Sequence, residues 1–518
     1  MAVPSKCSRF ALLIAVMLVA LTVAARTVKL TEFPSAIHND ESGIAVYVVP
    51  TFLGPKAAPA MWGFNGYGGH GNFGNWLLSL PAQVAGESTL LGVRSMAAVC
   101  GILSALCFAL GLRAAYGGRV ALIFLAFVAP FHFHVHFSRT GFQYITAAFT
   151  IGLVTWAFGC VVSKPSKKNS AFLGAALGLA LNTYSATHIL PGALAAGLLA
   201  LFLSPNYRQA EPHGRLRPFA ALLAMATAGF LVTFGAQLWY LIVYGFPNSS
   251  RVHSQLWLLH PKPGQEGISI AAIAQTLWMH LEKTLRFFYE RDNAAQYGCS
   301  RGLLEAWSAG LAALGALVLA WRSLRLDPFS IFVISAAVLT LVGSSFMVEG
   351  NFSPHLIIFA LLAPMACAVG LDTILRLAKV RSQALSAAIV AAAAIPWSMW
   401  NYSYLRDVDG RKDSIINWLL HLPIERTEVT NMVNFSSHST DFKESMYPLM
   451  FPKAAYTTEQ PTDVPAAIRS FMQAKSCPCV FIINTSASES AAQAVAESGK
   501  AAETFSYGKL PAVALFVK

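Results

Sequence analysis

The sequence has few charged residues for its length. Of its 518 residues, 12% are charged and 55% are hydrophobic, and the mean hydropathy is +0.53. Soluble globular proteins carry about 25% charged residues, so this composition excludes that class and indicates a polytopic membrane protein. The net charge of +12 does not indicate a partner nucleic acid, because Lys and Arg occur in short clusters between apolar runs rather than along one basic face.

The sequence also lacks a cysteine framework and a phosphate-binding loop. The eight cysteines are widely spread, and the spacing of Cys477 and Cys479 suits neither a CxxC redox motif nor a zinc knuckle. The glycine-rich stretch 61–74 has no strand before it and no Lys-Ser/Thr pair after it, so it is not a phosphate loop. Its aromatic side chains fit an external loop that faces a substrate, and plain flexibility explains them equally well.

Long apolar runs dominate what is present. They cover residues 10–25, 88–112, 120–137, 142–162, 171–184, 188–203, 219–244, 303–321, 329–348, 355–375 and 382–400. These runs predict an all-α membrane protein with about eleven transmembrane helices, several of them close to the lower length limit for a span. The first run is either a helix or a cleaved signal peptide, and its length without a helix-breaking residue favours the helix.

Cationic residues mark every second loop between these runs. The clusters are Lys6 and Arg9; Arg113 and Arg119; Lys164, Lys167 and Lys168; Arg208, Arg215 and Arg217; Arg322 and Arg325; and Arg376, Lys379 and Arg381. Because cytoplasmic loops are enriched in Lys and Arg, this alternation predicts a cytoplasmic amino terminus in a plasma (inner) membrane. The first loop (26–87), the loop 247–302 and the chain beyond residue 400 are then outside.

A shift to polar composition after residue 400 divides the chain into a transmembrane domain, 1–400, and an extracytoplasmic domain, 401–518. Hydrophobic periodicity in the second domain predicts a small α/β fold. Its expected helices and strands are 464–473 and 487–499, and 479–484 and 512–517, respectively. In the outer loop, stretch 268–289 has apolar residues near helical spacing, which predicts a helix along the membrane surface or one packed under the loop.

Two adjacent carboxylates, Asp40 and Glu41, follow the first apolar run closely. An ionisable group at a membrane boundary is a hypothesis of a functional site, and we take both residues as catalytic candidates. Asp40 also has a structural interpretation as the N-cap of a helix. If the segment is helical, Glu41 points about 100° away from Asp40, where it orients an acceptor, binds a cation or faces water.

Other polar residues are candidates for binding. Arg139 is the one cation in a short external loop, which indicates either a partner for a phosphate group or an arginine that reaches the lipid headgroups. His132, His134 and His136 do not share a helix face, which favours polar lining of an outer cavity over a metal site. No cofactor is certain, and a divalent cation stays open. Further binding candidates are Tyr184, His188, Arg251, His253, His260 and His355.

Three blocks of sequence carry a resemblance to a known family. They are Phe33-Pro34 through His38-Asn-Asp40-Glu41, His136-Phe-Ser-Arg139-Thr-Gly-Phe142, and the stretch 178–191 around Tyr184 and His188. In these blocks, and in its order of helices and an outer carboxy-terminal domain, the chain resembles the glycosyltransferase C superfold. It is most similar there to bacterial relatives of the protein O-mannosyltransferases and of the aminoarabinose transferase of lipid A.

The resemblance implies a membrane enzyme that transfers a sugar from a polyprenyl-phosphate carrier to a hydroxyl acceptor at the outer face. The acceptor is then a protein, lipid A or another glycan. A hydroxyl is a weak nucleophile, and a carboxylate within hydrogen-bond reach can take its proton as the new bond forms. We expect Asp40 to be that base.

Two departures from the family pattern leave other functions open. The relatives usually carry an acidic residue within 71–80 and an arginine just inside the tenth helix, whereas residues 71–77 here read Gly-Asn-Phe-Gly-Asn-Trp-Leu and residues 355–359 contain no arginine. The acceptor site and phosphate clamp are therefore rebuilt, or catalysis is lost. The alternatives are a transporter or flippase of lipid-linked saccharide and a catalytically silent membrane assembly factor.

Overall fold

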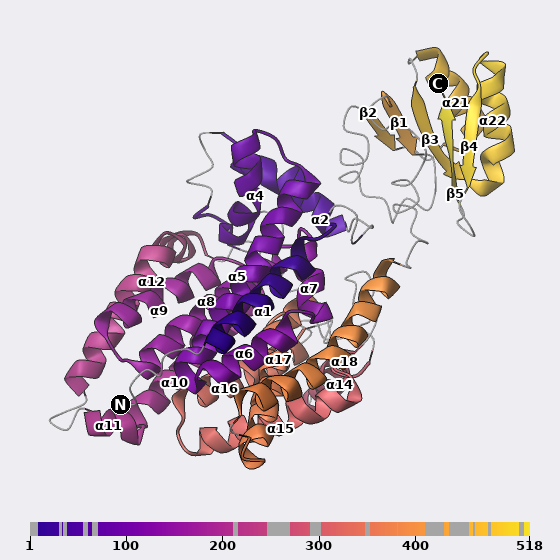
Figure 1. Ribbon diagram of the computed structural model, residues 1–518. Helices are drawn as coiled ribbons and strands as arrows, with labels where there is room; N and C mark the ends of the chain where they lie inside the picture. The colour runs from indigo at the N-terminus through magenta and orange to yellow at the C-terminus, as the bar shows by residue number, and fades with distance from the viewer. Residues whose placement is uncertain are drawn as a thin grey trace.

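The protein consists of a body of long helices and a small α/β domain at the carboxyl end (Figure 1). The computed structural model describes residues 9–30, 34, 39–54, 61–64, 71–210, 216–245, 270–290, 302–347, 353–380, 382–409, 429–434, 455–458, 461–474, 478–506 and 512–517. The predicted class, a helical polytopic membrane protein with a small carboxy-terminal α/β domain, is confirmed.

The helical body contains nine helices, among the described residues, that are long and apolar enough to cross a membrane. They are α1 (Arg9–Thr27), α5 (Leu90–Tyr116), α8 (Tyr144–Ser163), α10 (Leu190–Leu203) with the preceding turn η3 (Ser185–Ile189), α12 (Leu216–Tyr244), α15 (Ala306–Leu324), α16 (Pro328–Ser345), α17 (Phe359–Leu377) and α18 (Gln383–Asp409). The helices α6 (Gly118–Val128) and α7 (His132–Arg139) meet at a bend of 67° and make a tenth span if they are taken together.

All eleven predicted runs correspond to helices, and the difference in the number of spans comes from α9 (Lys167–Leu181). This helix covers the run 171–184 but has only 15 residues. At 1.5 Å per residue it is about 22 Å long, shorter than the hydrocarbon layer of about 30 Å. It nevertheless leads from the basic turn at Lys167 to Asn182, on which α4 begins, so it connects the two ends of the body as its neighbours do.

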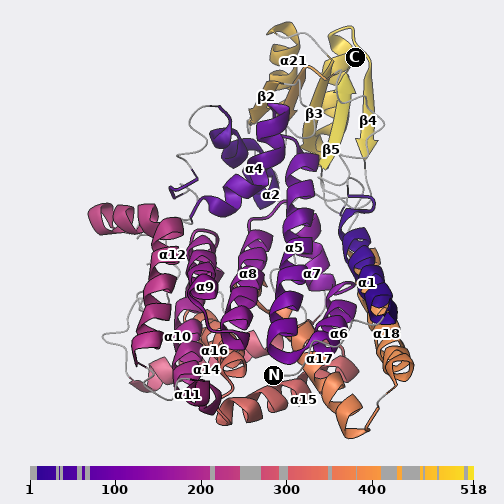
Figure 2. The same cartoon turned by 60° about the vertical axis from the view of Figure 1, so that its left-hand side comes forward.

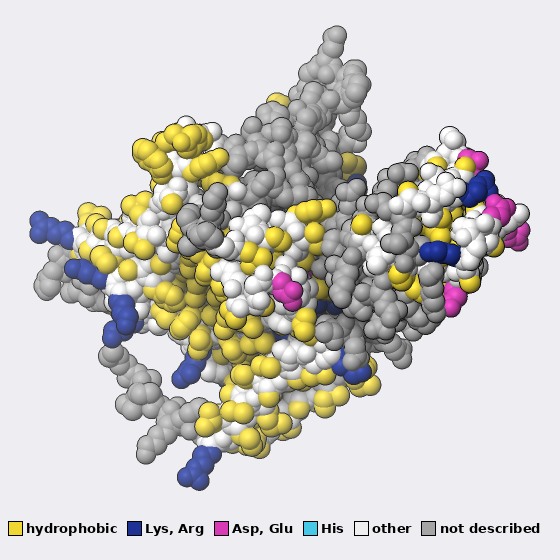
Figure 3. All heavy atoms as spheres, turned by 90° about the horizontal axis from the view of Figure 1, so that it is seen from above, with side chains coloured by type: hydrophobic (Ala, Val, Ile, Leu, Met, Phe, Trp, Pro, Cys, Tyr) yellow, Lys and Arg dark blue, Asp and Glu magenta, His cyan; other side chains and the backbone are white. Residues whose placement is uncertain are grey.

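Successive helices run in alternating directions, so the predicted basic loops gather at one end of the body. At this end, a salt bridge and a cation–ring contact join elements that are far apart in the sequence, and a second salt bridge lies within α17. Asp372 of α17 pairs with Arg119 at the start of α6 (2.5 Å) and with Arg376 one turn further along α17 (2.7 Å). The guanidinium of Arg322 lies 4.6 Å from the ring centre of Tyr116. Figure 3 shows the largely hydrophobic surface of the body, with Lys and Arg side chains along one margin.

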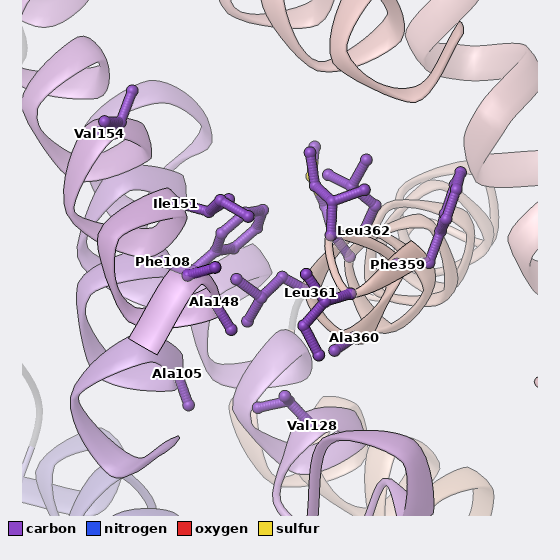
Figure 4. Packing of buried hydrophobic residues seen from close by; sticks show 14 of the residues in the cluster. Ala105, Phe108, Val128, Ala148, Ile151, Val154, Phe359, Ala360, Leu361 and Leu362 are labelled. Carbon is purple, nitrogen blue, oxygen red and sulfur yellow. The ribbon is translucent and has the colours of Figure 1, made fainter. Parts of the chain in front are cut away.

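Small residues allow the central helices to pack closely. A Cβ atom on Gly159 of α8 would lie 2.7 Å from the backbone oxygen of Gly111 of α5, and one on Gly152 would lie 2.6 Å from that of Ser104. Between these contacts the core is filled by larger side chains from α5, α8 and α17, including Phe108, Ile151 and the segment 359–362 (Figure 4). Close backbone approach through Gly and Ala is typical of helices that associate inside a bilayer.

The helix predicted within 268–289 is present as α14 (Ile270–Arg286). Ile270 and Trp278 are 86% and 66% exposed, whereas His280 is buried. One side of α14 is therefore apolar and exposed, as a helix along the membrane surface requires, and another side is packed against the body.

The carboxy-terminal domain contains a five-stranded mixed sheet in the order β2-β1-β3-β5-β4. The strands are β1 (Asn431–Asn434), β2 (Ala455–Thr458), β3 (Cys479–Asn484), β4 (Ala502–Ser506) and β5 (Ala512–Val517), and the helices are α21 (Val464–Ala474) and α22 (Ser488–Glu497). The first three strands in this order are parallel, and β5 and β4 are antiparallel to their neighbours. Both predicted helices and both predicted strands are present, whereas β1, β2 and β4 were not predicted.

Two features of this half of the chain did not follow from the sequence. The predicted domain boundary at residue 400 lies inside α18, which continues to Asp409. The sequence showed no cysteine framework, whereas Cys479 is disulfide-bonded.

Candidate active site

The first loop, 26–87, is largely helical in its described parts. The short helix α2 (Asn39–Gly43) carries Asp40 and Glu41 and continues into the turns η1 (Ile44–Val48) and η2 (Val49–Phe52). After residue 71, α4 (Phe73–Ala85) begins on the end of α9, where the backbone N–H of Phe73 donates to the carbonyl of Asn182 (3.0 Å). In Figure 2, α2 and α4 lie together at the end of the body opposite α15.

Glu41 is completely buried in a network of hydrogen bonds. Arg94 in the first turns of α5 donates from Nε to Oε1 (2.7 Å) and from Nη2 to Oε2 (2.9 Å), and the backbone N–H of Gly141 donates to Oε1 (2.6 Å). Arg94 also donates to the carbonyl of Pro34 (2.9 Å). A paired, two-point contact of this kind fixes geometry as well as charge. Glu41 therefore anchors α2 to α5 and to the turn that precedes α8.

Asp40 points elsewhere, as helical geometry predicts for its neighbour. It is half-buried, and the hydroxyl of Tyr144 in the first turn of α8 donates to its Oδ2 (3.0 Å). The Tyr144 ring meets the ring of Tyr184 edge-on at 4.8 Å, and Tyr184 in turn stacks on His355 at 6.0 Å. Three of the predicted residues, Asp40, Tyr184 and His355, are thus joined in one row through Tyr144, which the sequence did not suggest.

Arg139 lies in a different environment from the one that we expected. Its side chain is buried, with Nη1 donating to Ala25 O (3.1 Å) and Nη2 donating to Val28 O (2.8 Å) and Lys29 O (2.9 Å). These carbonyls belong to the last turn of α1 and the residues after it, which lack partners within the helix. The guanidinium therefore caps the end of α1, and its role as a partner of a phosphate or a lipid headgroup stays a prediction.

The three histidines of α7 lie in different surroundings. His132 contacts Asn401 Oδ1 through Nδ1 (2.7 Å), and His134 contacts the hydroxyl of Ser104 (2.7 Å) and Arg26 Nη2 (2.8 Å). His136 is buried beside Phe137. In the part of the chain that the structure describes, no group of three His, Cys, Asp or Glu side chains is arranged to hold a metal ion.

The remaining candidates are not part of the row. His188 lies exposed in η3. Arg251, His253 and His260 lie outside the described residues.

Sequence analysis missed Arg94 and Tyr144, and only Arg94 gave a signal. It is a cation within the apolar run 88–112, and an ionisable residue in such a run usually has a partner. Tyr144 has no comparable signature, because an aromatic residue at the start of an apolar helix is common at membrane boundaries.

The fold is similar to solved membrane glycosyltransferases. ArnT from Cupriavidus metallidurans bound to undecaprenyl phosphate aligns with a TM-score of 0.56 and 12% identity over 98% of this chain and 98% of that one. Its apo form aligns with a TM-score of 0.54 and 12% identity, over 99% and 98% of the two chains. An oligosaccharyltransferase from Archaeoglobus fulgidus aligns with a TM-score of 0.48 and 15% identity, over 92% of this chain and 68% of that one.

The chain therefore has the glycosyltransferase C fold and is an integral membrane protein, as the resemblance predicted. Within it, residues 69–232 match the sequence model of the family described as dolichyl-phosphate-mannose-protein mannosyltransferase. No curated protein matches the sequence.

Proposed function

We infer that the protein is a glycosyltransferase that moves a sugar from a polyprenyl-phosphate carrier to a hydroxyl acceptor. The observation that carries this inference is the half-buried carboxylate of Asp40, held by Tyr144 at one end of a row of aromatic rings in a glycosyltransferase C fold. The family match over 69–232 and the undecaprenyl phosphate bound in the ArnT structure support a lipid-phosphate donor.

Asp40 acts as the general base in this proposal. Its Oδ2 accepts one hydrogen bond from Tyr144, and a carboxylate in this half-buried position is within reach of an acceptor hydroxyl. A base that takes the proton as the carbon–oxygen bond forms typically contributes about 10²- to 10⁴-fold to the rate. The leaving group is the lipid phosphate.

Glu41 serves a different purpose from the one that we expected. Both of its oxygens accept hydrogen bonds from Arg94 or Gly141, and its side chain is 0% exposed. A carboxylate in this state has no room for an acceptor. Glu41 is a positioning residue, because it holds the helix that presents Asp40.

The proposed orientation puts Asp40 and the carboxy-terminal domain outside the cell and the amino terminus in the cytoplasm. Two observations support it. The basic turns gather at the end of the body opposite α2, in keeping with the enrichment of cations on the cytoplasmic side. Disulfides persist in oxidising compartments, and Cys479 is disulfide-bonded.

The test is transfer by purified protein in liposomes, with a panel of undecaprenyl-phosphate sugars and with protein, lipid A and glycan acceptors. Asp40→Asn keeps the size of the side chain but removes the base, and we expect its rate to fall at least about 100-fold. Glu87→Gln is the matched control, because Glu87 is an exposed carboxylate in the same predicted outer loop. Parallel reactions with EDTA test whether a divalent cation takes part.

Retained transfer by Asp40→Asn would contradict the assignment of the base. Movement of the saccharide across the liposome membrane without a new glycosidic bond would instead favour the transporter.

A further inference from the structure

The last turn of α1 places an arginine, Arg26, inside the helical body, where its side chain is 0% exposed. Its Nη1 donates to Thr22 O (2.9 Å) and Ala129 O (3.1 Å), and its Nη2 donates to Val128 O (3.1 Å) and His134 Nδ1 (2.8 Å). A buried charge is costly unless it is hydrogen-bonded, and an ionisable group inside a membrane protein is a hypothesis of a functional site. The role of this side chain therefore needs an explanation.

Arg26 bridges the bend of 67° between α6 and α7. Val128 and Ala129 end α6, and Pro130, which has no backbone N–H, cannot donate to continue it. The last carbonyls of a helix lack partners within it, and their partial negative charge favours a cation. The guanidinium gives α6 both the missing donors and the positive charge, and it reaches His134 on the other side of the bend.

The contact with Arg26 also assigns the proton of the neutral His134 ring. A guanidinium has no acceptor atom, so Nδ1 of His134 accepts and the ring proton lies on Nε2. Nε2 then donates to the hydroxyl of Ser104 in α5 (2.7 Å), and this hydroxyl donates to Gly101 O (2.8 Å). One directed chain of hydrogen bonds thus joins α1, α7 and α5.

The helix α18 holds the bend from a second side. Asn401 Nδ2 donates to Trp397 O (2.7 Å), so its Oδ1 accepts from the backbone N–H and from Nδ1 of His132 (2.7 Å each). The ring N–H of Trp397 donates to Phe127 O (2.8 Å). In Figure 2, α1, α6, α7 and α18 lie together along one side of the body. Because non-helical backbone inside a membrane needs such partners, these contacts fix the direction in which α7 leaves the bend.

The other end of α7 reaches the candidate active site. Arg139 donates back to the carbonyls at the end of α1, and the backbone N–H of Gly141 donates to Oε1 of Glu41 (2.6 Å), the neighbour of Asp40. The helix α7 has eight residues and is about 12 Å long. A helix this short moves as one piece, so a shift at the bend is transmitted to the turn that binds Glu41.

We propose that Arg26 is a positioning residue of the candidate active site. It fixes α7 at the bend, and thereby the Gly141 N–H that holds Glu41 and the helix α2 that carries Asp40. This proposal rests on the function proposed above, in which the carboxylate of Asp40 meets an acceptor hydroxyl. A misplacement of about 1 Å can cost about 100-fold in rate, so a residue that touches no substrate can control the reaction.

Three variants weaken this arrangement to different degrees. Arg26→Met removes the charge and the donors at nearly the same length, Arg26→Lys keeps the charge, and Ser104→Ala removes only the partner of His134 Nε2. The control is Arg119→Met, because Arg119 is an arginine at the opposite end of α6, where it pairs with Asp372 of α17 (2.5 Å).

Transfer in liposomes gives kcat and the KM for the donor of each variant, both expressed per folded protein. We expect Arg26→Met to lower kcat about 10- to 100-fold and to leave the KM for the donor within about twofold, with smaller losses of kcat in Arg26→Lys and Ser104→Ala. In the Asp40→Asn background, Arg26→Met should cost less than about twofold more, because its effect passes through Asp40, whereas independent effects would multiply. Arg119→Met leaves kcat unchanged.

Hydrogen–deuterium exchange of residues 39–52 reports the position of α2 and the turns after it without any substrate. In Arg26→Met this exchange should become about tenfold faster, the loss of hydrogen bonds to a charged group. Arg119→Met should leave it unchanged. If Arg26→Met does not fold, Arg26→Lys and Ser104→Ala give the same test with smaller effects.

Wild-type kcat together with unchanged exchange of residues 39–52 in the Arg26 variants would overturn the proposal, and so would losses that multiply with Asp40→Asn. Failure of the proposed function gives a different result. If the wild-type protein transfers no sugar, the transferase proposal fails, and the exchange of residues 39–52 still decides whether Arg26 positions α2.

Discussion

Asp40 and Glu41 are neighbours in the chain, yet their carboxylates have opposite surroundings. The backbone of α2 turns them apart, so that Glu41 meets Arg94 inside the protein and Asp40 meets the hydroxyl of Tyr144 in a half-buried position. The contacts of Glu41 hold α2 in place, whereas the carboxylate of Asp40 is partly exposed and can meet a substrate.

The hydroxyl of Tyr144 orients the carboxylate of Asp40, so Tyr144→Phe should lower kcat by about tenfold, in line with the loss of a hydrogen bond to a charged group. The KM for the donor should change little, since the ring itself remains. The matched control is Tyr116→Phe, because Tyr116 donates to Asp327 (3.1 Å) at the opposite end of the body. Equal losses in the two variants, measured as initial rates of transfer, would contradict a role of Tyr144 at Asp40.

At the scale of elements, the pair Glu41–Arg94 joins α2 to α5. Both side chains are almost inaccessible, at 0% and 2% exposure, so removing one partner leaves the other charge buried. We expect Glu41→Leu and Arg94→Met each to lower the free energy of unfolding by about 3–5 kcal/mol, and the double variant to recover most of that loss. Denaturant unfolding of the purified proteins measures all three values.

The exposed pair Arg469–Glu497 of the carboxy-terminal domain is the control for that cycle. Its side chains are 45% and 47% exposed, and Arg469→Ala should cost less than about 1 kcal/mol. Strictly additive losses in the double variant would show that Glu41 and Arg94 do not depend on each other.

The contact between α5 and α8 makes a second prediction at this scale. Gly159→Ala places a Cβ 2.7 Å from Gly111 O, and overpacking of this kind typically costs about 1–3 kcal/mol. Gly235→Ala in α12 is the control, because nothing lies within 4 Å of its Cβ position, and replacing a helical glycine there should stabilise the helix by up to about 1 kcal/mol. Thermal unfolding of both variants in the same detergent gives the comparison, and a stable Gly159→Ala protein would argue against close backbone contact.

At the scale of the whole molecule, one end of the helical body carries the basic turns and the other carries α2, α4 and the candidate site. The proposed orientation predicts that Glu87→Cys reacts with a membrane-impermeant maleimide added to intact cells and that Lys167→Cys reacts only after the membrane is opened. Both positions are exposed, and three of the eight native cysteines, Cys100, Cys107 and Cys367, are buried. The parent protein labelled in parallel gives the background from the remaining five. The reverse labelling pattern would invert the topology and place Asp40 in the cytoplasm.

Composition and periodicity were enough to predict the membrane class, the helical runs, the alternation of basic loops, and two strands and two helices of the carboxy-terminal domain. These features are local. A segment inside a bilayer must form its own backbone hydrogen bonds as an apolar helix, and a strand or helix of the outer domain must have apolar residues at the period that places them on its buried face. The sequence also suggested Asp40, because two carboxylates beside an apolar run are unusual there.

Which polar side chains meet depends on packing between segments that are far apart in the chain. Arg94 is separated from Glu41 by 53 residues, and Tyr144 from Asp40 by 104. The partners of Arg139, His132 and His134 likewise lie on other helices, where no local pattern indicates them. Whether a charged group is free for a substrate depends on the neighbours that packing brings to it, and no local pattern in the sequence contains those neighbours.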